Sequence, residues 1–424
     1  MSVAMMLTLM LGFALSISIA VSIGSASVAG IALFGQVPMV VIPKEIFTAI
    51  DKYPLAAIPF FILAGNLMEV GGISRRLVEF AKSLVGGMQG GLAATCVLTC
   101  MIFASVSGSS VATTFAIGAI LIPAMIRHGY PTPFAASLQA VSAELGVIIP
   151  PSIPMILYGV SAEVSIGELF IAGFGPGLLI GGALIAFVLI WSRVKGYGKN
   201  DGDGRMAFGP ALKNAALALL MPVIILGGIY GGVFTPTEAS VVAVFYALAV
   251  GMLIYREIKP ADLGWIFKKS VISSAVIMFI IANAGLFSFL ITRAGVPEQI
   301  GEFLRQSLSD PVHFLLGVNV ALFVIGMFIE TSASIIVLAP ILVPVAASFG
   351  VDPVHFGTIM IVNLAMGMIT PPFGVNLFAA CSVAKIPLDR MIGSLIPFVL
   401  VIVACLMTIT YVPQVSLFLR DLAF

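Results

Sequence analysis

The sequence predicts an all-α, polytopic membrane protein. Of its 424 residues, 60% are hydrophobic and 9% are charged, and the mean hydropathy of +1.17 lies far above the range of soluble globular domains. Apolar runs of roughly 15 to 25 residues recur from Met5 to Phe418, and each suits a bilayer core of about 30 Å. Because lipid offers no partner to backbone polar groups, these runs must be helical.

Charge, histidine and cysteine usage point away from several other classes of protein. The net charge of +1 gives no indication of a nucleic-acid partner. The three histidines are widely spread, and the four cysteines all lie within apolar runs. The sequence therefore predicts neither a transition-metal site nor a disulfide framework.

Residues 1–89 are predicted to form scaffold spans and one surface helix. The apolar run at 3–35 is too long for one span, and two short helices would divide it. Residues 36–52 mix prolines with charges, as in an interfacial loop or a helix lying flat, and residues 53–70 form the next span. Residues 73–84 alternate charged and apolar positions, which indicates an amphipathic helix at the membrane surface.

The first unusual polar stretch, ASVSGSSVATT, lies at residues 104–114. Its flanking apolar arms, 90–103 and 111–126, would each reach only about 21 to 24 Å as helices. We therefore predict a re-entrant hairpin over 90–127 whose tip stops inside the membrane.

A proline pair interrupts the helix that follows this hairpin. Pro150 and Pro151 lack the amide donor that a helix needs, so the element at 131–162 must be a broken helix. The hairpin and the broken helix together make up the first-repeat transport elements, residues 90–165.

The second half of the chain contains the same succession of elements. Residues 312–387 are predicted to hold a hairpin at 312–349, with its tip IETSAS at 329–334, and a broken helix at 353–385 that is interrupted at Pro371-Pro372. The remaining segments are scaffold spans at 166–311 with a polar cytoplasmic linker at 193–213 and an amphipathic helix at 297–308, and a final span at 388–424.

A constant offset indicates that the two halves are internal repeats. The two Pro-Pro pairs lie 221 residues apart, and the same offset relates five further residues without a gap: Pro123 to Pro344, Gly129 to Gly350, Gly146 to Gly367, Ser161 to Ser382 and Pro176 to Pro397. Between the Pro-Pro pairs the chain crosses the membrane an odd number of times, so the repeats are predicted to be antiparallel. The basic loops at 193–213 and 256–269 then lie on one side, the cytoplasm, and the loop at 232–237 lies outside.

Two ion sites are predicted where each hairpin tip meets a helix break. Broken helices offer unpaired carbonyl oxygens and the tips add hydroxyls, which are ligands that a hard cation such as sodium prefers. The first site would use Ser105, Ser107, Gly108 and Ser110 with Gly146, Ile149 and Pro150; the second would use Glu330, Thr331, Ser332 and Ala333 with Gly367, Met368 and Thr370. Helix N-termini at both tips would present N–H groups to a carboxylate, with Ser109, Thr113, Ser152 and Asn376 as candidate substrate-binding residues.

Each of these features also has a purely structural interpretation. Small and hydroxyl residues commonly serve close helix packing, and Pro-Pro breaks are often only kinks. Asn66, Asn363 and Asn376 could be interhelical hydrogen-bonding residues. Glu144 and Glu330 are carboxylates inside membrane segments, which are usually paired or functional, and Glu144 could pair with a distant basic residue.

Four motifs resemble the large membrane subunit of tripartite ATP-independent periplasmic (TRAP) transporters, of the DctM-like family. They are FASVSGSSVATTFAIG at 103–118, GVIIPPS at 146–152, GGVFTPTEAS at 231–240 and MFIETSASIIVLAPILVPV at 327–345, and they occur in order over essentially the whole chain.

The resemblance implies a multi-pass protein of the bacterial inner membrane that works as an inverted-repeat, elevator-type transporter. It implies Na⁺ as the coupling ion, with sodium ligands at the two tips and the two breaks. It also implies two partners, a small four-helix membrane subunit as a separate chain and a periplasmic substrate-binding protein. The expected substrate is a small organic anion such as a C4-dicarboxylate, sialic acid, or a sugar or keto acid.

Two alternatives stay open at this point. One is a stand-alone sodium/anion symporter of related fold. The other is an intramembrane enzyme, for which Ser109 and Ser110 have no assignable histidine, aspartate or lysine partner within the membrane segments.

Overall fold

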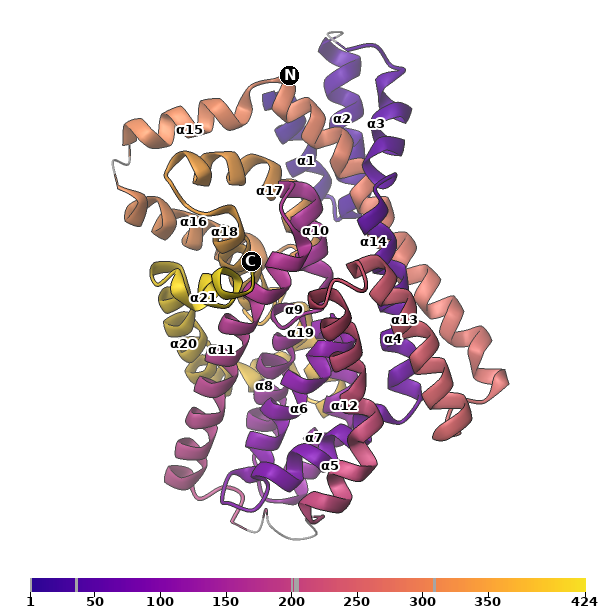
Figure 1. Cartoon of the computed structure of the whole chain (residues 1–424). Helices are drawn as coiled ribbons and strands as arrows, with labels where there is room; N and C mark the ends of the chain where they lie inside the picture. The colour runs from indigo at the N-terminus through magenta and orange to yellow at the C-terminus, as the bar shows by residue number, and fades with distance from the viewer. Residues whose placement is uncertain (1, 35–36, 200, 202–205, 308–309) are drawn as a thin grey trace.

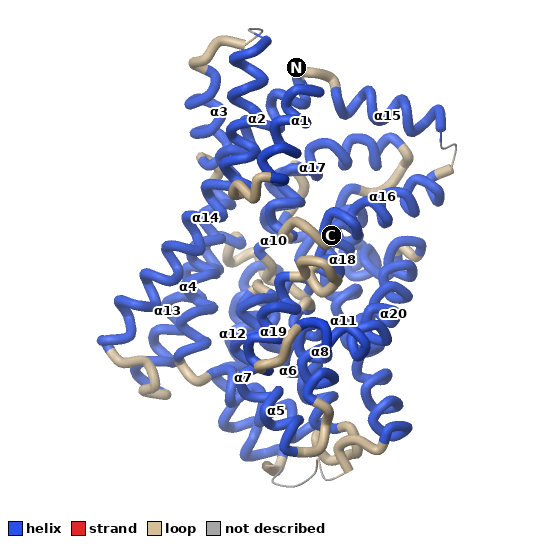
Figure 2. The backbone as a smooth tube through the Cα atoms, turned by 180° about the vertical axis from the view of Figure 1, so that it is seen from behind, coloured by secondary structure: helices blue, strands red, loops and turns tan. Residues whose placement is uncertain are grey.

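The computed structural model describes residues 2–34, 37–199, 201, 206–307 and 310–424. These described residues form helices and contain no strand (Figures 1 and 2). Eight helices in this part of the chain are long and apolar enough to cross a membrane, or nine if one bent pair counts as a span. Residue 35 of the first apolar run, residues 200 and 202–205 of the predicted linker and residue 308 of the second amphipathic helix lie outside the described residues.

The predicted scaffold of the first 89 residues is resolved into separate helices. The long apolar run divides into two, and the expected span and amphipathic helix are both present. The elements are α1 (Ser2–Ala14), α2 (Ile19–Phe34), α3 (Val41–Ile50), the 3₁₀ turn η1 (Tyr53–Ala56), α4 (Ala57–Val70) and α5 (Ile73–Val85).

The predicted first-repeat transport elements, residues 90–165, contain two arms and a broken helix. The arms are α6 (Gly91–Ser107) and α7 (Ser110–Arg127), which pack against each other. The broken helix consists of α8 (Thr132–Ala143), the short α9 (Leu145–Ile148) and α10 (Ile153–Ala162), and its two parts are bent by 42°.

The middle of the chain contributes long spans. They are α11 (Ile166–Lys195), α12 (Phe208–Tyr230), α13 (Pro236–Leu248) with the π-helix η2 (Ala249–Ile254), and α14 (Pro260–Arg293). The α14 helix begins ten residues earlier than the predicted span at 270, because Pro260 occupies its first turn and Asp262 accepts a hydrogen bond from the Lys259 amide.

The second-repeat region follows the order of the first, and the C-terminus differs from expectation. Its elements are α15 (Val296–Ser307), α16 (Pro311–Gly326), α17 (Thr331–Ser348), α18 (Pro353–Gly367), α19 (Val375–Ala384), α20 (Leu388–Tyr411) and α21 (Gln414–Ala423). The predicted final span at 388–424 is therefore two helices, because Pro413 ends α20 and the amphipathic α21 packs along α11.

Helix boundaries in the two repeat regions share the offset seen in the sequence. The α7 helix starts at 110 and ends at 127, and α17 starts at 331 and ends at 348, a shift of 221 at both ends. The α8 and α18 helices start at 132 and 353, again 221 apart. Gly129 and Gly350, which follow α7 and α17, both have a left-handed φ, of +84° and +78°.

The packing of the two regions is reciprocal. In Figure 1, α5 to α8 occupy the lower half of the molecule and α15 to α18 the upper half. The α10 helix of the first region packs against α17, and the α19 helix of the second region packs against α7. Each region therefore sends the second part of its broken helix to the hairpin of the other.

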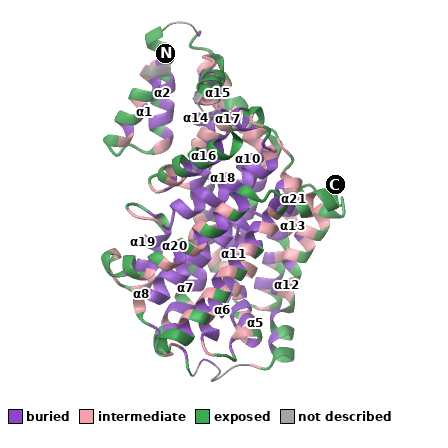
Figure 3. Cartoon of the chain, turned by 90° about the vertical axis from the view of Figure 1, so that its left-hand side faces the viewer, coloured by how far each residue is buried: buried purple, intermediate pink, exposed green. Residues whose placement is uncertain are grey.

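Burial follows this arrangement (Figure 3). Nearly every residue of α8 and α18 is buried, whereas α12 and α1 carry many exposed apolar side chains. Exposed apolar surface on the outer helices is what a lipid environment requires, since lipid and not a protein core solvates it.

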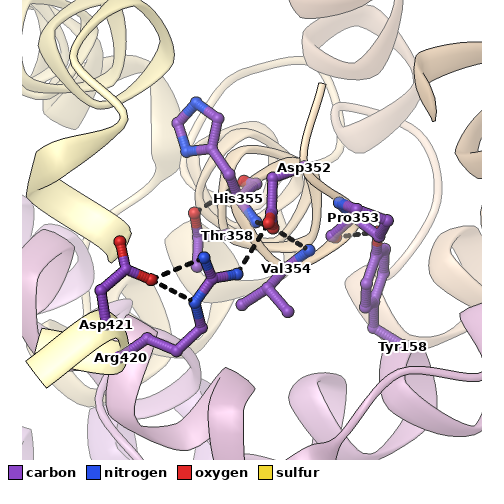
Figure 4. A network of polar contacts seen from close by, with 8 residues as sticks. All are labelled: Tyr158, Asp352, Pro353, Val354, His355, Thr358, Arg420 and Asp421. Atoms are coloured by element: carbon purple, nitrogen blue, oxygen red, sulfur yellow. Dashed lines mark hydrogen bonds and ion pairs between the residues drawn. The ribbon is translucent and has the colours of Figure 1, made fainter. Parts of the chain in front are cut away.

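Polar contacts fix the base of each hairpin to a neighbouring segment. At the first base, Asp201 Oδ2 accepts hydrogen bonds from the Leu92 amide at 2.9 Å and the Tyr130 hydroxyl at 2.6 Å. At the second base, Arg420 of α21 pairs with Asp352 at 2.7 Å, next to the Asp421 and Tyr158 contacts drawn in Figure 4.

Asp352 also caps α18, and its surroundings keep it ionised. Its Oδ1 accepts hydrogen bonds from the amides of Val354 and His355. Partial burial alone would raise the pKa of Asp352, but the hydrogen bonds and charge of Arg420, together with these amides, outweigh it and lower the pKa below its usual value.

Candidate functional site

Glycine and serine end the first arm and start the second at the first tip. Gly108 has a φ of +61°, a left-handed conformation that disfavours other residues, and its amide still bonds to the Ala104 carbonyl at 3.3 Å. Ser109 is extended and is the N-cap of α7, where its Oγ accepts from the Ala112 amide at 3.4 Å. The chain thus reverses within two residues.

The hydroxyl groups of the first tip bond to one another. Ser107 Oγ and Thr113 Oγ1 lie 3.1 Å apart, and they lie 3.3 and 2.8 Å from the Ser109 carbonyl oxygen, so their two protons can serve two of these three contacts at a time. Ser107 and Thr113 are buried. Three oxygens are therefore held together at a buried chain reversal.

The first helix break lies directly against this tip. A methyl group at Gly146 would lie 2.8 Å from Thr113 Oγ1 and 2.9 Å from the Ser109 carbonyl oxygen, so only glycine allows this approach. The Gly108 carbonyl accepts from the Ile153 amide at 3.5 Å. Within the break, Ser152 Oγ donates to the Val147 carbonyl at 2.6 Å, which leaves the Ser152 hydroxyl engaged in local structure.

A carboxylate caps the second tip in place of serine. Glu330 is the N-cap of α17, where Oε2 accepts from the Ala333 amide at 3.2 Å and Oε1 accepts from Ser332 Oγ at 2.8 Å. An anionic cap suits the positive end of a helix. The Glu330 carboxylate also accepts from the Ala333 amide, one of the N–H groups that the sequence analysis expects to face a bound carboxylate.

The second break again lies against its tip. Thr331 Oγ1 lies 3.0 Å from Met368 Sδ, and a methyl group at Gly367 would overlap the backbone of Gly326 at the end of α16. Thr370 Oγ1 donates to the Met366 carbonyl at 2.9 Å. The Met368 carbonyl accepts from the Asn376 amide at 3.2 Å.

The structure brings part of each predicted ion site together. The first cluster contains Ser107, Gly108 and Gly146 of the predicted ion site, together with Ser109 and Thr113, which are predicted to bind substrate. The second contains Glu330, Thr331, Ser332, Ala333, Gly367 and Met368.

Other predicted site residues make local contacts. Ser105 Oγ donates to the Ile102 carbonyl at 2.7 Å within α6, and the Ser110 carbonyl accepts from Thr114 Oγ1. Ile149 is the extended residue after α9, and Pro150 forms a cis peptide bond with Pro151.

Sequence reasoning missed the contact that joins the two breaks. The side-chain nitrogen Nδ2 of Asn376, at the start of α19, donates to Oε1 of Glu144, at the end of α8. The sequence offers Asn376 as a candidate substrate-binding residue and a distant basic residue as a partner for Glu144, whereas the structure pairs Glu144 with Asn376. The signal in the sequence was a carboxylate next to a helix break, which indicates that Glu144 has a partner. Sequence periodicity cannot identify that partner, because the two residues lie 232 positions apart.

The other two asparagines connect helices. Asn66 donates to Ser270 Oγ at 2.8 Å, between α4 and α14, and Asn363 donates to Asn319 Oδ1 at 2.6 Å, between α18 and α16. Asn319 in turn donates to Thr410 of α20 at 3.1 Å. Their interpretation as interhelical hydrogen-bonding residues is confirmed.

Buried carbonyls and hydroxyls at two chain breaks are the kind of oxygen ligands that a hard cation takes. Among the described residues, no three His, Cys, Asp or Glu side chains gather as a transition-metal site would require.

A family of known sequences matches nearly the whole chain. The profile of the family described as "Tripartite ATP-independent periplasmic transporter, DctM component" matches residues 3–415.

Individual relatives agree with this match. The chain is 42% identical over 400 residues to the C4-dicarboxylate TRAP transporter large permease protein DctM of Pseudomonas aeruginosa, covering 94% of each chain. It is also 42% identical over 403 residues to the isethionate TRAP transporter permease protein DctMQ of Oleidesulfovibrio alaskensis, covering 95% of this chain and 64% of that protein.

The fold is similar to that of a solved membrane transporter. The crystal structure of the YdaH transporter of Alcanivorax borkumensis aligns with a TM-score of 0.62 and 16% identity, covering 87% of this chain and 86% of that one. At this identity the likeness concerns the fold alone.

Proposed function

The chain belongs to the family of the DctM component of tripartite ATP-independent periplasmic transporters, and from this premise we propose that it imports a small organic anion with sodium across the bacterial inner membrane. Its relatives are permeases, so the chain is a transporter component and not an enzyme. Its apolar helices make it a multi-pass membrane protein.

One observation carries the sodium part of this proposal. Each hairpin tip lies against a helix break, and the glycines that permit the contact, Gly146 and Gly367, are 221 residues apart. Two similar oxygen-rich turns at matched positions are what two cation sites in a duplicated transporter would require.

The proposed site residues follow from these contacts. The first sodium ion would be held by Ser107 and carbonyls of the tip and of the Gly146–Pro150 segment, and the second by Thr331 and carbonyls of the 367–370 segment. The substrate anion would lie between the tips. The names of the relatives, with C4-dicarboxylate and isethionate, favour a small anion with few carbon atoms.

The mechanism that we propose is an inverted-repeat elevator. The reciprocal packing of α10 on α17 and α19 on α7 would let both hairpins and both broken helices move as one body. In α4, Gly65 faces the first tip, where a methyl group would meet Ser107 Cα at an ordinary van der Waals distance of 3.5 Å. Such a small-residue contact suits a sliding boundary.

We also propose two partners, a small four-helix membrane subunit as a separate chain and a periplasmic substrate-binding protein. The alignment covers 64% of the DctMQ relative but 94% of the Pseudomonas relative, so the DctMQ protein contains a further segment, which supports a small membrane partner. The exposed apolar surface of α1 and α12 offers area for such a partner or for lipid.

The test is uptake by proteoliposomes that contain this chain and the small subunit, with the binding protein outside. An inward sodium gradient should drive accumulation of labelled C4-dicarboxylate or isethionate, and an equal potassium gradient should not. Uptake that ignores sodium would contradict the coupling. Uptake without the binding protein would favour a stand-alone symporter.

A further inference from the structure

An apolar cavity lies where the first two helices of the predicted scaffold face the second hairpin, in the upper half of the molecule in Figure 1. It has a volume of about 180 Å³ and is lined by side chains of α1, α2, α14, α16 and α17. The scaffold helices supply one wall, which includes Met10 and Phe287, and the hairpin supplies the other, which includes Ile325 and Val337. The cavity therefore lies on the boundary between the scaffold and a transport element.

The cavity reaches the outer surface of α1. Met6 and Met10 line it and are themselves 44% and 55% exposed, so the wall is incomplete on this side. Leu7 and Leu11, which lie beside them on α1, are also exposed, and the surface around the opening is therefore apolar. In a multi-pass membrane protein, lipid chains solvate a surface of this kind.

Water is a poor occupant of this cavity. A buried water molecule needs about two to four polar partners. Within the part of the chain that the structure describes, no charged side chain lines the cavity, and Ser334 offers a single hydroxyl. Apolar cavities of about 150 Å³ stay dry and take up small hydrocarbons, so a hydrocarbon is the occupant that fits.

The size and the lining of the cavity suit one flexible chain. A helix of a partner protein is about 10 Å across and is too wide for a cavity of 180 Å³. A single acyl chain is slender and can bend to follow the walls. Met6 and Met10 at the opening are unbranched and have adaptable side chains, which suits an occupant that is itself flexible.

We propose that an acyl chain of a membrane phospholipid occupies this cavity and bridges α1 and α2 to the second hairpin. Ile329 and Ala333 belong to the wall and lie on either side of Glu330, so the chain lies against the second tip. The bilayer thereby supplies part of the packing between scaffold and hairpin. The inference needs only the membrane location of the chain and does not depend on sodium or substrate.

The test places a tryptophan in the cavity of the full chain, without sodium or substrate. The protein is reconstituted in dioleoyl phosphatidylcholine or in the same lipid with dibrominated chains, because bromine atoms quench nearby tryptophans. Trp191 and Trp265, the two tryptophans of the chain, are first replaced by phenylalanine. Phe287→Trp is the reporter, since Phe287 lines the cavity and is only 1% exposed.

Phe287→Trp should lose as much fluorescence in brominated lipid as Leu11→Trp, on the exposed face of α1. Phe356→Trp in α18 is the control and should lose little, because Phe356 is fully buried and does not line this cavity. Adding Leu9→Phe, which fills part of the cavity from α1, should reduce the quenching of Phe287→Trp to the level of the control. Adding Leu7→Phe, on the exposed face of α1, should leave it unchanged.

Two results would overturn the proposal. Equally weak quenching of Phe287→Trp and Phe356→Trp would show that no chain enters the cavity. Quenching of Phe287→Trp that Leu9→Phe leaves unchanged would show that the bromine atoms act from outside it. If Phe287→Trp does not fold, Phe13→Trp, in the same lining, is the reporter, and the comparison of Leu9→Phe with Leu7→Phe decides alone.

Discussion

The two hairpin tips place their polar groups differently. At the first tip, the hydroxyls of Ser107 and Thr113 bond to each other and to the Ser109 carbonyl. At the second tip, the Glu330 carboxylate caps its own helix and Thr331 faces a methionine sulfur. The helix boundaries are thus more alike than the chemistry of the tips.

The hairpin arms differ in the same way. The α6 and α7 arms pack along each other, whereas α16 packs mainly on α18 and makes little contact with α17. The second hairpin is therefore the more open of the two. A shared offset in sequence fixes where helices start and end, but the side chains at the contacts decide how firmly the arms close.

The largest expected effect concerns the two glycines at the breaks. Gly367→Ala would force a methyl group into the backbone of Gly326, which cannot rotate away, and should destabilise the protein by about 3 kcal/mol or more. Gly146→Ala meets a threonine hydroxyl that can move, as well as a carbonyl, and should cost about 1 to 2 kcal/mol.

Thermal unfolding of both variants in detergent measures this difference. Gly317→Ala in α16, where a methyl group meets open space, is the control and should unfold like the wild type. If Gly146→Ala lost more thermal stability than Gly367→Ala, the contact at Gly146 would be the tighter of the two, contrary to this prediction.

The second prediction separates the tips by sodium dependence. Ser107→Ala removes one hydroxyl from a preformed cluster, and Thr331→Ala removes one from the second tip, so each should lower sodium-driven uptake by about tenfold. Membrane insertion should be normal, and Thr408→Ala, on the exposed face of α20, should transport like the wild type. Unaltered sodium dependence in both variants would argue against these sites.

The third prediction concerns the base of the second hairpin. Arg420→Ala removes the ion pair to Asp352 and should weaken the attachment of α21 by about 1 kcal/mol, which hydrogen exchange of the α21 amides measures. Asp352→Asn should act similarly. Asp421→Asn should exchange like the wild type, because Asp421 is largely exposed.

The same ion pair predicts how the stability of the α21 attachment changes with pH. Because the folded protein lowers the pKa of Asp352, the stability that it contributes is present above the unfolded-chain pKa of about 3.9 and is lost as the pH falls through the lower folded value. A fall in the protection factors of the α21 amides on acidification in the wild type, after correction for the intrinsic exchange rate at each pH, and its absence in Arg420→Ala, would show this. Protection factors that rise on acidification would contradict it.

The smallest expected effect concerns Ser109 and Glu330, the N-cap residues of α7 and α17. Ser109→Ala removes a hydrogen bond of 3.4 Å and should cost less than about 0.5 kcal/mol. Glu330→Ala removes a carboxylate with two partners and should cost about 1 kcal/mol in apparent stability. If thermal unfolding showed equal losses of stability in Ser109→Ala and Glu330→Ala, the two caps would not differ as we predict.

The sequence allowed the elements to be predicted well where a physical signal is local. Prolines fixed both breaks, apolar length fixed the spans from α4 to α20, and the 221-residue offset anticipated the boundaries of α17 and α18. Glycine and serine also marked the first turn of the candidate site, and the polar stretch IETSAS marked the second.

Contacts between distant segments could not be predicted in the same way. Neither the Glu144–Asn376 contact nor the Arg420–Asp352 pair follows from spacing, because each joins helices whose neighbours depend on the whole arrangement. The reversal at Pro413 was overlooked since the apolar pattern continues into α21.

The central claim is that a duplicated unit is inserted in opposite directions, and sided cysteine labelling tests it most directly. Arg127 and Ser348 are both exposed, end α7 and α17, and lie 221 residues apart. In intact cells and inverted vesicles, a membrane-impermeant thiol reagent should label Arg127→Cys only from the cytoplasmic side and Ser348→Cys only from the outside. The four native cysteines are buried and give the background. Labelling of both variants from the same side would contradict the inverted arrangement.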